Sequence, residues 1–139
     1  MASSGRPDTL AAVIVLAGLF LALVLAWSPV DNTIGRFIYE DMFYYLKVAQ
    51  NLAAGEGSTF DGITSTNGYH PLWMAIATAL ALLFQGDMLV HAVLTVAALL
   101  HAAQGLVLLG MMRRVASAPV ALALTALYLL NWRTLASNL

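Results

Sequence analysis

The feature that most constrains the fold of this chain is an apolar run of eighteen residues without charge, from Leu10 to Trp27. As an α-helix this run reaches about 27 Å, close to the thickness of the hydrocarbon core of a bilayer. It is longer than the apolar part of an ordinary signal peptide, and Ser28-Pro29 follows it without a clear small-residue cleavage site. We therefore expect a retained transmembrane helix over residues 10–28, preceded by a cytoplasmic tail over residues 1–9.

The composition of the whole chain agrees with a membrane protein. Its 139 residues are 61% hydrophobic and 9% charged, with a mean hydropathy of +0.84. A soluble domain of this size could not cover so much apolar surface. The absence of cysteine excludes disulfides and thiolate metal sites, the net charge of −1 is uninformative, and no basic patch indicates nucleic acid as a partner. The sequence predicts an all-α integral membrane protein, in contact with membrane lipids.

A second long apolar run covers 88–112 and ends at Arg113-Arg114, the only paired basic residues in the chain. Cytoplasmic loops carry the excess of Lys and Arg in membrane proteins. We expect a second span over 88–112, a cytoplasmic turn over 113–116 and a third span over 115–132. Residues 133–139 would then form the end of this stretch, where a longer chain would continue. The implied location is the cytoplasmic (inner) membrane of the cell envelope, with a multi-pass topology and a cytoplasmic N-terminus.

The apolar stretch between the first two spans is shorter. Pro71 to Gln85 has fifteen residues before Gly86-Asp87, or about 22 Å as a helix. If it crossed the membrane, the arginine pair would lie on the outer side, against the charge rule. We expect a short outer-face or re-entrant helix over 71–86; an arrangement of four crossing segments is the alternative.

A polar interval separates the first span from this short helix. Seven of the thirteen charged residues lie between Asp31 and Asp61, within a predicted outer (periplasmic) loop over 29–70. Helical spacing of apolar residues, with Gly55 as a stop, predicts an interfacial helix over about 42–54. Its apolar face would carry Tyr45, Val48, Ala49 and Leu52, and its polar face Tyr44, Lys47, Gln50 and Asn51.

The adjacent acids Glu40 and Asp41 stand where this interfacial helix begins. The structural interpretation of Asp41 is a helix N-cap, worth about 0.5–2 kcal/mol. The functional interpretation is an ionised carboxylate that binds a divalent cation or accepts a proton. Glu40 beside it adds negative charge that a cation would compensate. Downstream, Asn67-Gly68 predicts a tight turn, and His70 is a candidate ligand or proton shuttle, although a lone interfacial histidine more often has a structural role.

Polar residues are few inside the predicted spans. His91 and His101 are ten residues apart, which places them about 80° apart around a helix and disfavours a shared metal site. Interhelical hydrogen bonding is the better interpretation of these histidines and of Gln104. Gly105 and Gly110 would allow close approach of another helix. A transporter is the least favoured class, because ionisable residues lining a path are missing from the spans apart from the histidines.

Two stretches of the loop carry a resemblance to a known superfamily. These are Glu40-Asp41-Met42-Phe43-Tyr44-Tyr45, running on to Ala54-Gly55, and Thr66-Asn67-Gly68-Tyr69-His70-Pro71-Leu72-Trp73. With one span before them, they resemble the first outer loop of GT-C membrane glycosyltransferases, such as protein mannosyltransferases, aminoarabinose transferases and oligosaccharyltransferases. The resemblance covers the N-terminal part of the family, whose members usually have eight or more spans.

The resemblance implies a partial GT-C fold and inverting transfer of a sugar from a polyprenyl-phosphate donor to an acceptor hydroxyl at the outer face. It implies that Asp41 is the catalytic acid, with Glu40 supporting it or sharing an Mg²⁺ or Mn²⁺ ion. Its candidate substrate-binding residues are Lys47, Tyr44, Asn67 and His70. The rest of a longer chain, or partner helices, would complete the enclosure of the donor, and this stretch by itself would be inactive.

The competing class is a non-catalytic small membrane protein or subunit. In that case the acidic outer loop would bind a cation or a partner without performing chemistry. Loss of sugar transfer in the complete protein on replacement of Asp41 would separate the two classes.

Overall fold

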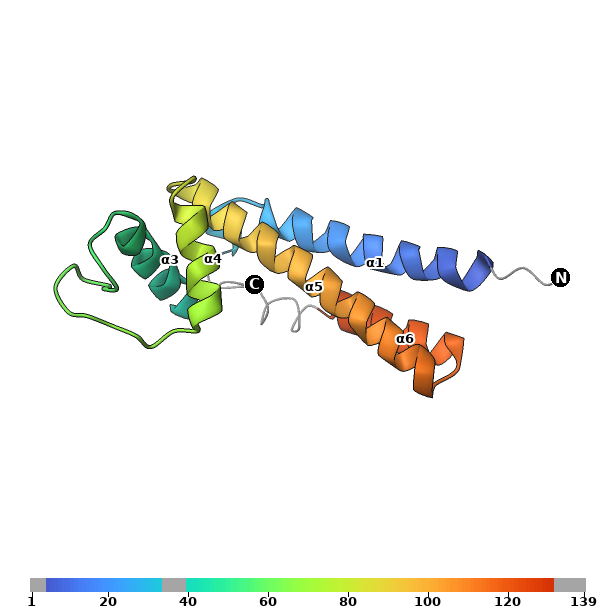
Figure 1. Ribbon diagram of the computed structural model, residues 1–139. Helices are drawn as coiled ribbons and strands as arrows, with labels where there is room; N and C mark the ends of the chain where they lie inside the picture. Colours follow the sequence, from blue (N-terminus) through green and yellow to red (C-terminus); the bar gives the residue numbers. More distant parts are fainter. Residues whose placement is uncertain (1–4, 34–39, 132–139) are drawn as a thin grey trace. The chain divides into compact units, whose positions relative to one another are not determined.

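The computed structural model describes residues 5–33 and 40–131, and every regular element in these residues is a helix (Figure 1). This confirms the all-α part of the expected fold. The helices are α1 (Gly5–Ala26), α2 (Val30–Thr33), α3 (Glu40–Ala53), α4 (Pro71–Ala81), α5 (Asp87–Val115) and α6 (Ala118–Leu130).

The chain forms two compact units. One, the bundle unit, contains Met1–Ser28 and Thr95–Leu139, and the other, the loop unit, contains Pro29–Leu94. Helix α5 contributes its first residues to the loop unit and the remainder to the bundle unit.

Two helices are long and apolar enough to cross a membrane. They are Asp8–Ala26 in α1 and Asp87–Val115, which is the whole of α5. The 29 residues of α5 extend about 43 Å, more than the hydrocarbon core requires. Both helices fall where the sequence predicts the first two spans.

Within the bundle unit, α1 and the bundle part of α5 run antiparallel. Asp8 Oδ1, near the start of α1, lies 3.1 Å from Arg113 Nη2 in the last turn of α5. At the other end, the Trp27 indole donates a hydrogen bond of 3.1 Å to the Thr95 hydroxyl. Because these pairs join opposite ends of the two helices, the helices traverse the bundle in opposite directions.

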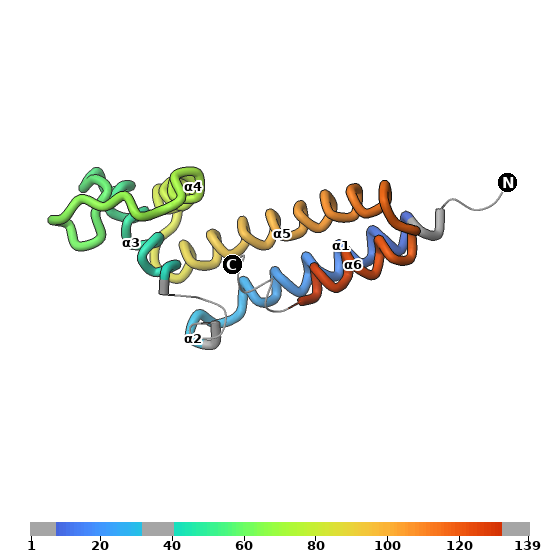
Figure 2. Tube along the Cα trace, turned by 90° about the horizontal axis from the view of Figure 1, so that it is seen from below, coloured from blue at the N-terminus to red at the C-terminus, as the bar shows by residue number. Residues whose placement is uncertain are grey.

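Helix α6 packs against α1 within the same unit (Figure 2). The fully buried Leu129 lies at Gly18 of α1 and Gly105 of α5, where an added Cβ would come within 2.9 and 2.5 Å of its side chain. Gly105 therefore permits the close helix approach that the sequence predicts. Gly110 does not, because an added Cβ there would meet no described atom within 4 Å.

The buried His101 joins α5 to α6. Its ring stacks on Tyr128, with centroids 4.9 Å apart, and its Nε2 lies 3.4 Å from the Leu129 carbonyl oxygen. That carbonyl is in the last turn of α6, where backbone acceptors lack helical partners. Tyr128 also donates a hydrogen bond to Gln104. The interhelical interpretation of His101 and Gln104 is thus confirmed.

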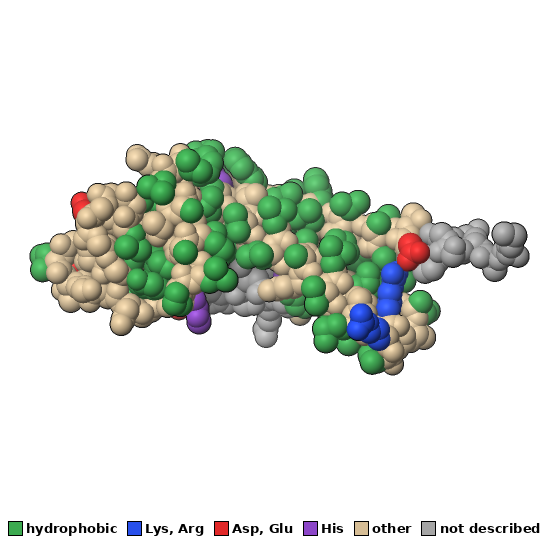
Figure 3. All heavy atoms as spheres, in the orientation of Figure 1, with side chains coloured by type: hydrophobic (Ala, Val, Ile, Leu, Met, Phe, Trp, Pro, Cys, Tyr) green, Lys and Arg blue, Asp and Glu red, His purple; other side chains and the backbone are tan. Residues whose placement is uncertain are grey.

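Large apolar side chains remain exposed along the bundle unit. On α1 they include Leu16 and Phe20, which are 63% and 70% exposed, and α5 and α6 carry others. Only 28% of the apolar window of α1 is buried, whereas the core helix of a soluble protein would be mostly buried. Figure 3 shows apolar side chains spread over the visible face, with Lys or Arg and acidic side chains gathered near the start of α1.

Two of the predicted segments have different bounds. The predicted third span begins at Ala118 and not at 115, because Ser117 precedes the helix in an extended conformation and a proline lies in its first turn. The 13 residues of α6 extend about 20 Å, short of a full span. Helix α4 has 11 residues, or about 16 Å, and ends at Ala81, so it is shorter than the predicted segment 71–86.

Candidate functional site

Helix α3 carries the candidate catalytic acids and is positioned by its packing against α4 in the loop unit. One stripe of each helix is apolar, so burying both stripes stabilises the pair. The buried side chains are Met42, Leu46, Val48 and Ala49 on α3 and Met74, Ala77 and Ala81 on α4.

Asp41 lies in the first turn of α3 with its side chain exposed. Because α3 begins at Glu40, Asp41 is inside the helix and is not the N-cap that the structural interpretation suggested. No described residue forms a hydrogen bond or ion pair with its carboxylate. The positive end of the helix dipole stabilises a negative side chain in this turn. Asp41 is therefore an exposed acid that the described part of the fold does not engage. The side chain of Glu40 lies outside the described residues.

Aromatic side chains follow Asp41 by one helical turn and attach the long loop to α3. Tyr44 stacks on Phe60 with ring centroids 5.8 Å apart, and its hydroxyl is hydrogen-bonded to Thr66. The hydroxyl of Tyr45 accepts a hydrogen bond of 2.7 Å from the backbone N–H of His70. Tyr44, a predicted substrate contact, thus already has structural partners in the loop.

Asn51 is the second attachment point of the loop, and the sequence placed it on the wrong face of the helix. It is 3% exposed, and its amide donates hydrogen bonds to the carbonyl oxygens of Thr59 at 2.8 Å and Phe60 at 3.3 Å. A buried amide needs such partners, and the partners come from a loop that helical spacing does not describe. An asparagine beside the buried positions Val48 and Ala49 is a weak signal that could have suggested this role.

Asp61 organises the tip of the loop, a role that the sequence analysis did not predict. Its Oδ1 accepts hydrogen bonds from the backbone N–H groups of Ile63 at 2.8 Å and Thr64 at 2.7 Å, and from the Thr59 hydroxyl at 3.0 Å. These donors, the Thr64 and Ile63 amides first, hold the pKa of the Asp61 carboxyl well below its ordinary value. Asp61 is therefore a structural acid of the turn.

The other predicted substrate contacts are exposed: Lys47 on α3, Asn67 in the loop and His70 directly before α4. The hydrogen bonds of Tyr44 and Tyr45 bring the segment around Asn67 and His70 to the N-terminal half of α3. Lys47 follows Asp41 by six residues, which turns it about 120° away around the helix. The structure therefore gathers Tyr44 and the segment around Asn67 and His70 near the turn that follows Asp41, and it places Lys47 on another face.

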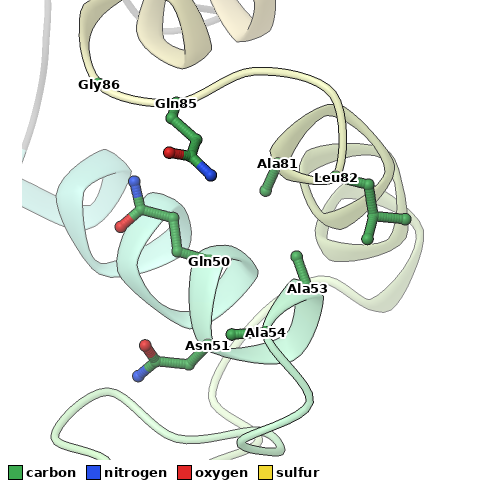
Figure 4. Close-up of a pocket in the computed structure, with 8 residues that line it drawn as sticks. All are labelled: Gln50, Asn51, Ala53, Ala54, Ala81, Leu82, Gln85 and Gly86. Carbon is green, nitrogen blue, oxygen red and sulfur yellow. The ribbon is translucent and has the colours of Figure 1, made fainter.

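A hollow of about 490 Å³ lies at the opposite end of α3 (Figure 4). Its walls come from the end of α3, the end of α4 and the turn before α5. Asp41 does not line it, because nine residues along α3, or about 14 Å, separate Asp41 from the first lining residue. The candidate acid and the hollow are thus separate sites. The lining residues are Gln50, Asn51, Ala53, Ala54, Ala81, Leu82, Gln85 and Gly86.

A metal at the paired acids stays a prediction. Among the described side chains, no three His, Asp or Glu residues form a group that could hold a metal ion. The Mg²⁺ or Mn²⁺ alternative requires Glu40 together with Asp41, and the Glu40 side chain is outside that set.

No protein-family model, no curated protein sequence and no solved structure matches this chain.

Proposed function

We propose that α1 and α5 cross the cytoplasmic membrane in opposite directions, with the N-terminus inside and the segment between them on the outer face. The exposed apolar side chains of α1 support this placement, because lipid would cover them. The antiparallel pairing of Asp8 with Arg113 and of Trp27 with Thr95 also supports it. The arginine pair at the end of α5 favours a cytoplasmic location for that end.

Because the chain contains no cysteine, single cysteines report this topology directly. We expect a membrane-impermeant maleimide added to intact cells to label Glu56→Cys in the exposed loop. Ser117→Cys, in the turn between α5 and α6, should react only after the membrane is opened. Equal labelling of both positions in intact cells would contradict the topology.

We further propose that the chain takes part in glycosyl transfer of the GT-C type. In this reaction an acceptor hydroxyl attacks the anomeric carbon of a polyprenyl-phosphate sugar, the new C–O bond forms with inversion and the lipid phosphate leaves. Asp41 takes the proton of the acceptor hydroxyl. The observation that carries the proposal is the exposed Asp41 carboxylate, which has no partner among the described residues although the loop beside it is firmly attached.

The proposal assigns different roles to the remaining candidates. The segment around Asn67 and His70 lies near the turn that follows Asp41 and would contact the acceptor. Lys47 would attract the donor phosphate as a point charge, and Glu40 would support Asp41 or share a divalent cation with it. Helices from a longer chain or from partners would enclose the lipid donor.

Replacement of Asp41 tests the catalytic role. In the complete protein in its native membrane, Asp41→Asn should lower the transfer of radiolabelled sugar from the polyprenyl-phosphate donor by about 10²–10⁴-fold, the usual contribution of a general base. Asp87→Asn is the matched control, because Asp87 is also an exposed acid in the first turn of a helix of the same unit. The Asp87→Asn variant should lose the same helix-dipole stabilisation as Asp41→Asn but should retain sugar transfer.

Either of two results would contradict the assignment. Near-normal transfer by Asp41→Asn would exclude Asp41 as the base. Equal losses in both variants would show that helix stability, and not proton transfer, explains the effect. If transfer persists while cation binding to the loop is lost, the non-catalytic subunit becomes the better interpretation.

A further inference from the structure

The hollow at the end of α3 is lined by uncharged residues only. Two glutamine side chains border it, Gln50 from α3 and Gln85 from the turn before α5, and their amides point toward each other, with the methyl groups of Ala53, Ala54 and Ala81 to one side (Figure 4). Asn51 also borders the hollow, but its amide is bound to the loop carbonyls of Thr59 and Phe60. The polar groups that face the hollow are therefore mainly the two glutamines.

Neither glutamine amide has a hydrogen-bond partner among the described residues. Each amide offers two donor hydrogens and an acceptor oxygen, and Gln50 is half-buried. Gln85 is exposed, and neither amide is buried without a partner, so a ligand that supplies complementary groups would take the place of water there. Ala53 and Ala81 are the last residues of α3 and α4, so both helices end at the hollow.

Both walls of the hollow are held in place by backbone hydrogen bonds. At the end of α3, Glu56 N–H donates to the Asn51 carbonyl at 2.9 Å, and Gly55 adopts a φ of +80° that closes the helix. At the end of α4, Phe84 N–H donates to the Leu80 carbonyl at 2.9 Å. Such walls reduce the entropy that a ligand would lose by ordering its site.

We propose that this hollow binds an uncharged polyhydroxylated ligand the size of a mono- or disaccharide. Amides match hydroxyl groups as both donors and acceptors, and the alanine methyls offer apolar contacts for the C–H groups of a sugar ring. A phosphate or carboxylate would find no lining cation. The volume of about 490 Å³ lies within the usual range of ligand sites. The inference does not depend on the proposed transfer reaction, because Asp41 is at the other end of α3.

The test uses the 139-residue chain in lipid nanodiscs, without sugar-based detergents. Maltose is the probe, and its binding is measured by saturation-transfer NMR. Loss of one amide hydrogen bond should weaken binding by about 2- to 12-fold, so Gln50→Leu and Gln85→Leu should each reduce affinity and together abolish detectable binding. Ala54→Leu, which fills the hollow and leaves both amides intact, should also abolish it.

Gln104→Leu is the matched control, because it removes the third glutamine of the chain from the bundle unit. It should bind maltose normally, and Asp41→Asn should do so even when sugar transfer is lost. The proposal is overturned if maltose gives no saturation transfer, or if the double glutamine variant binds as well as the parent. Tighter binding of maltose 1-phosphate or triglycine than of maltose would also overturn it.

Discussion

Leu129 makes the bundle unit sensitive to a single added methyl group at Gly105. A Cβ at Gly105 would lie 2.5 Å from Leu129 Cδ2, 2.9 Å from Cγ and 3.0 Å from Cδ1. Carbon atoms in good contact are about 3.5–4.0 Å apart, so the methyl group requires the leucine to move. Leu129 also packs closely on α1, because a Cβ added at Gly18 would lie 2.9 Å from the Leu129 Cβ.

Gly110→Ala supplies the reference for the size of this effect. Both glycines lie within α5, and both gain up to about 1 kcal/mol of helix propensity when replaced by alanine. Gly110 is exposed, and an added Cβ there meets nothing within 4 Å. The propensity gain cancels in the comparison, so the difference between the two variants is the overpacking cost, about 1–3 kcal/mol. Gly105→Ala should be the less stable by that amount.

The assay is reversible unfolding in mixed micelles as the mole fraction of dodecyl sulfate rises, followed by circular dichroism. A double-mutant cycle identifies the cause. In a Leu129→Ala background the space is already open, so the difference between Gly105→Ala and Gly110→Ala should fall close to zero. A difference below about 0.5 kcal/mol in the parent background, or one that persists after Leu129→Ala, would refute the close packing of α5 on α6.

Two further predictions concern the loop. Asn51→Leu removes both hydrogen bonds to the loop carbonyls and leaves the acceptor of the buried Thr59 without its donor, so it should destabilise the loop by about 1–3 kcal/mol. Faster amide hydrogen exchange at residues 59–66 would show it, and unchanged exchange would contradict it. Because the folded pKa of Asp61 is below its ordinary value of 3.8, its stabilisation is fully present above that pH and is lost as the pH falls through the folded pKa. The amide chemical shifts of Ile63 and Thr64 should therefore stay constant from pH 7 to about 4 and change only at lower pH, whereas a midpoint at the ordinary value would show that the turn does not hold the carboxylate.

Local composition accounts for the long helices. The uncharged apolar run from Leu10 to Trp27 is long enough to form a helix in which the backbone N–H and C=O groups bond to one another, whatever packs beside it. The same holds for the apolar run of α5. The residues at which the helices end were less predictable from the sequence. Helix α4 stops at Ala81, although apolar residues continue to Phe84, because the chain turns there through bonds to the Thr78 and Leu80 carbonyls.

The candidate site was predictable only in part. The pair Glu40-Asp41 and the helix that follows it come from local spacing, and the structure describes that helix with Asp41 exposed in its first turn. Helical periodicity placed Asn51 with the solvated residues, whereas the structure buries it against carbonyls contributed from eight and nine residues further along the chain. Apart from the adjacent Gly62, which is typical of a turn, the sequence did not indicate that Asp61 accepts hydrogen bonds within the loop.

The amino-acid sequence by itself determined which apolar runs are long enough to cross a membrane as helices and where the charges gather, since both depend on neighbouring residues alone. The tertiary structure decided which polar side chains form hydrogen bonds within the fold and which remain exposed. Asn51 and Tyr44 are bound by loop residues further along the chain, Asp41 is exposed, and a hollow with two glutamine amides forms at the far end of α3. Such pairings depend on loop closure and helix contact, which no local pattern of residues specifies.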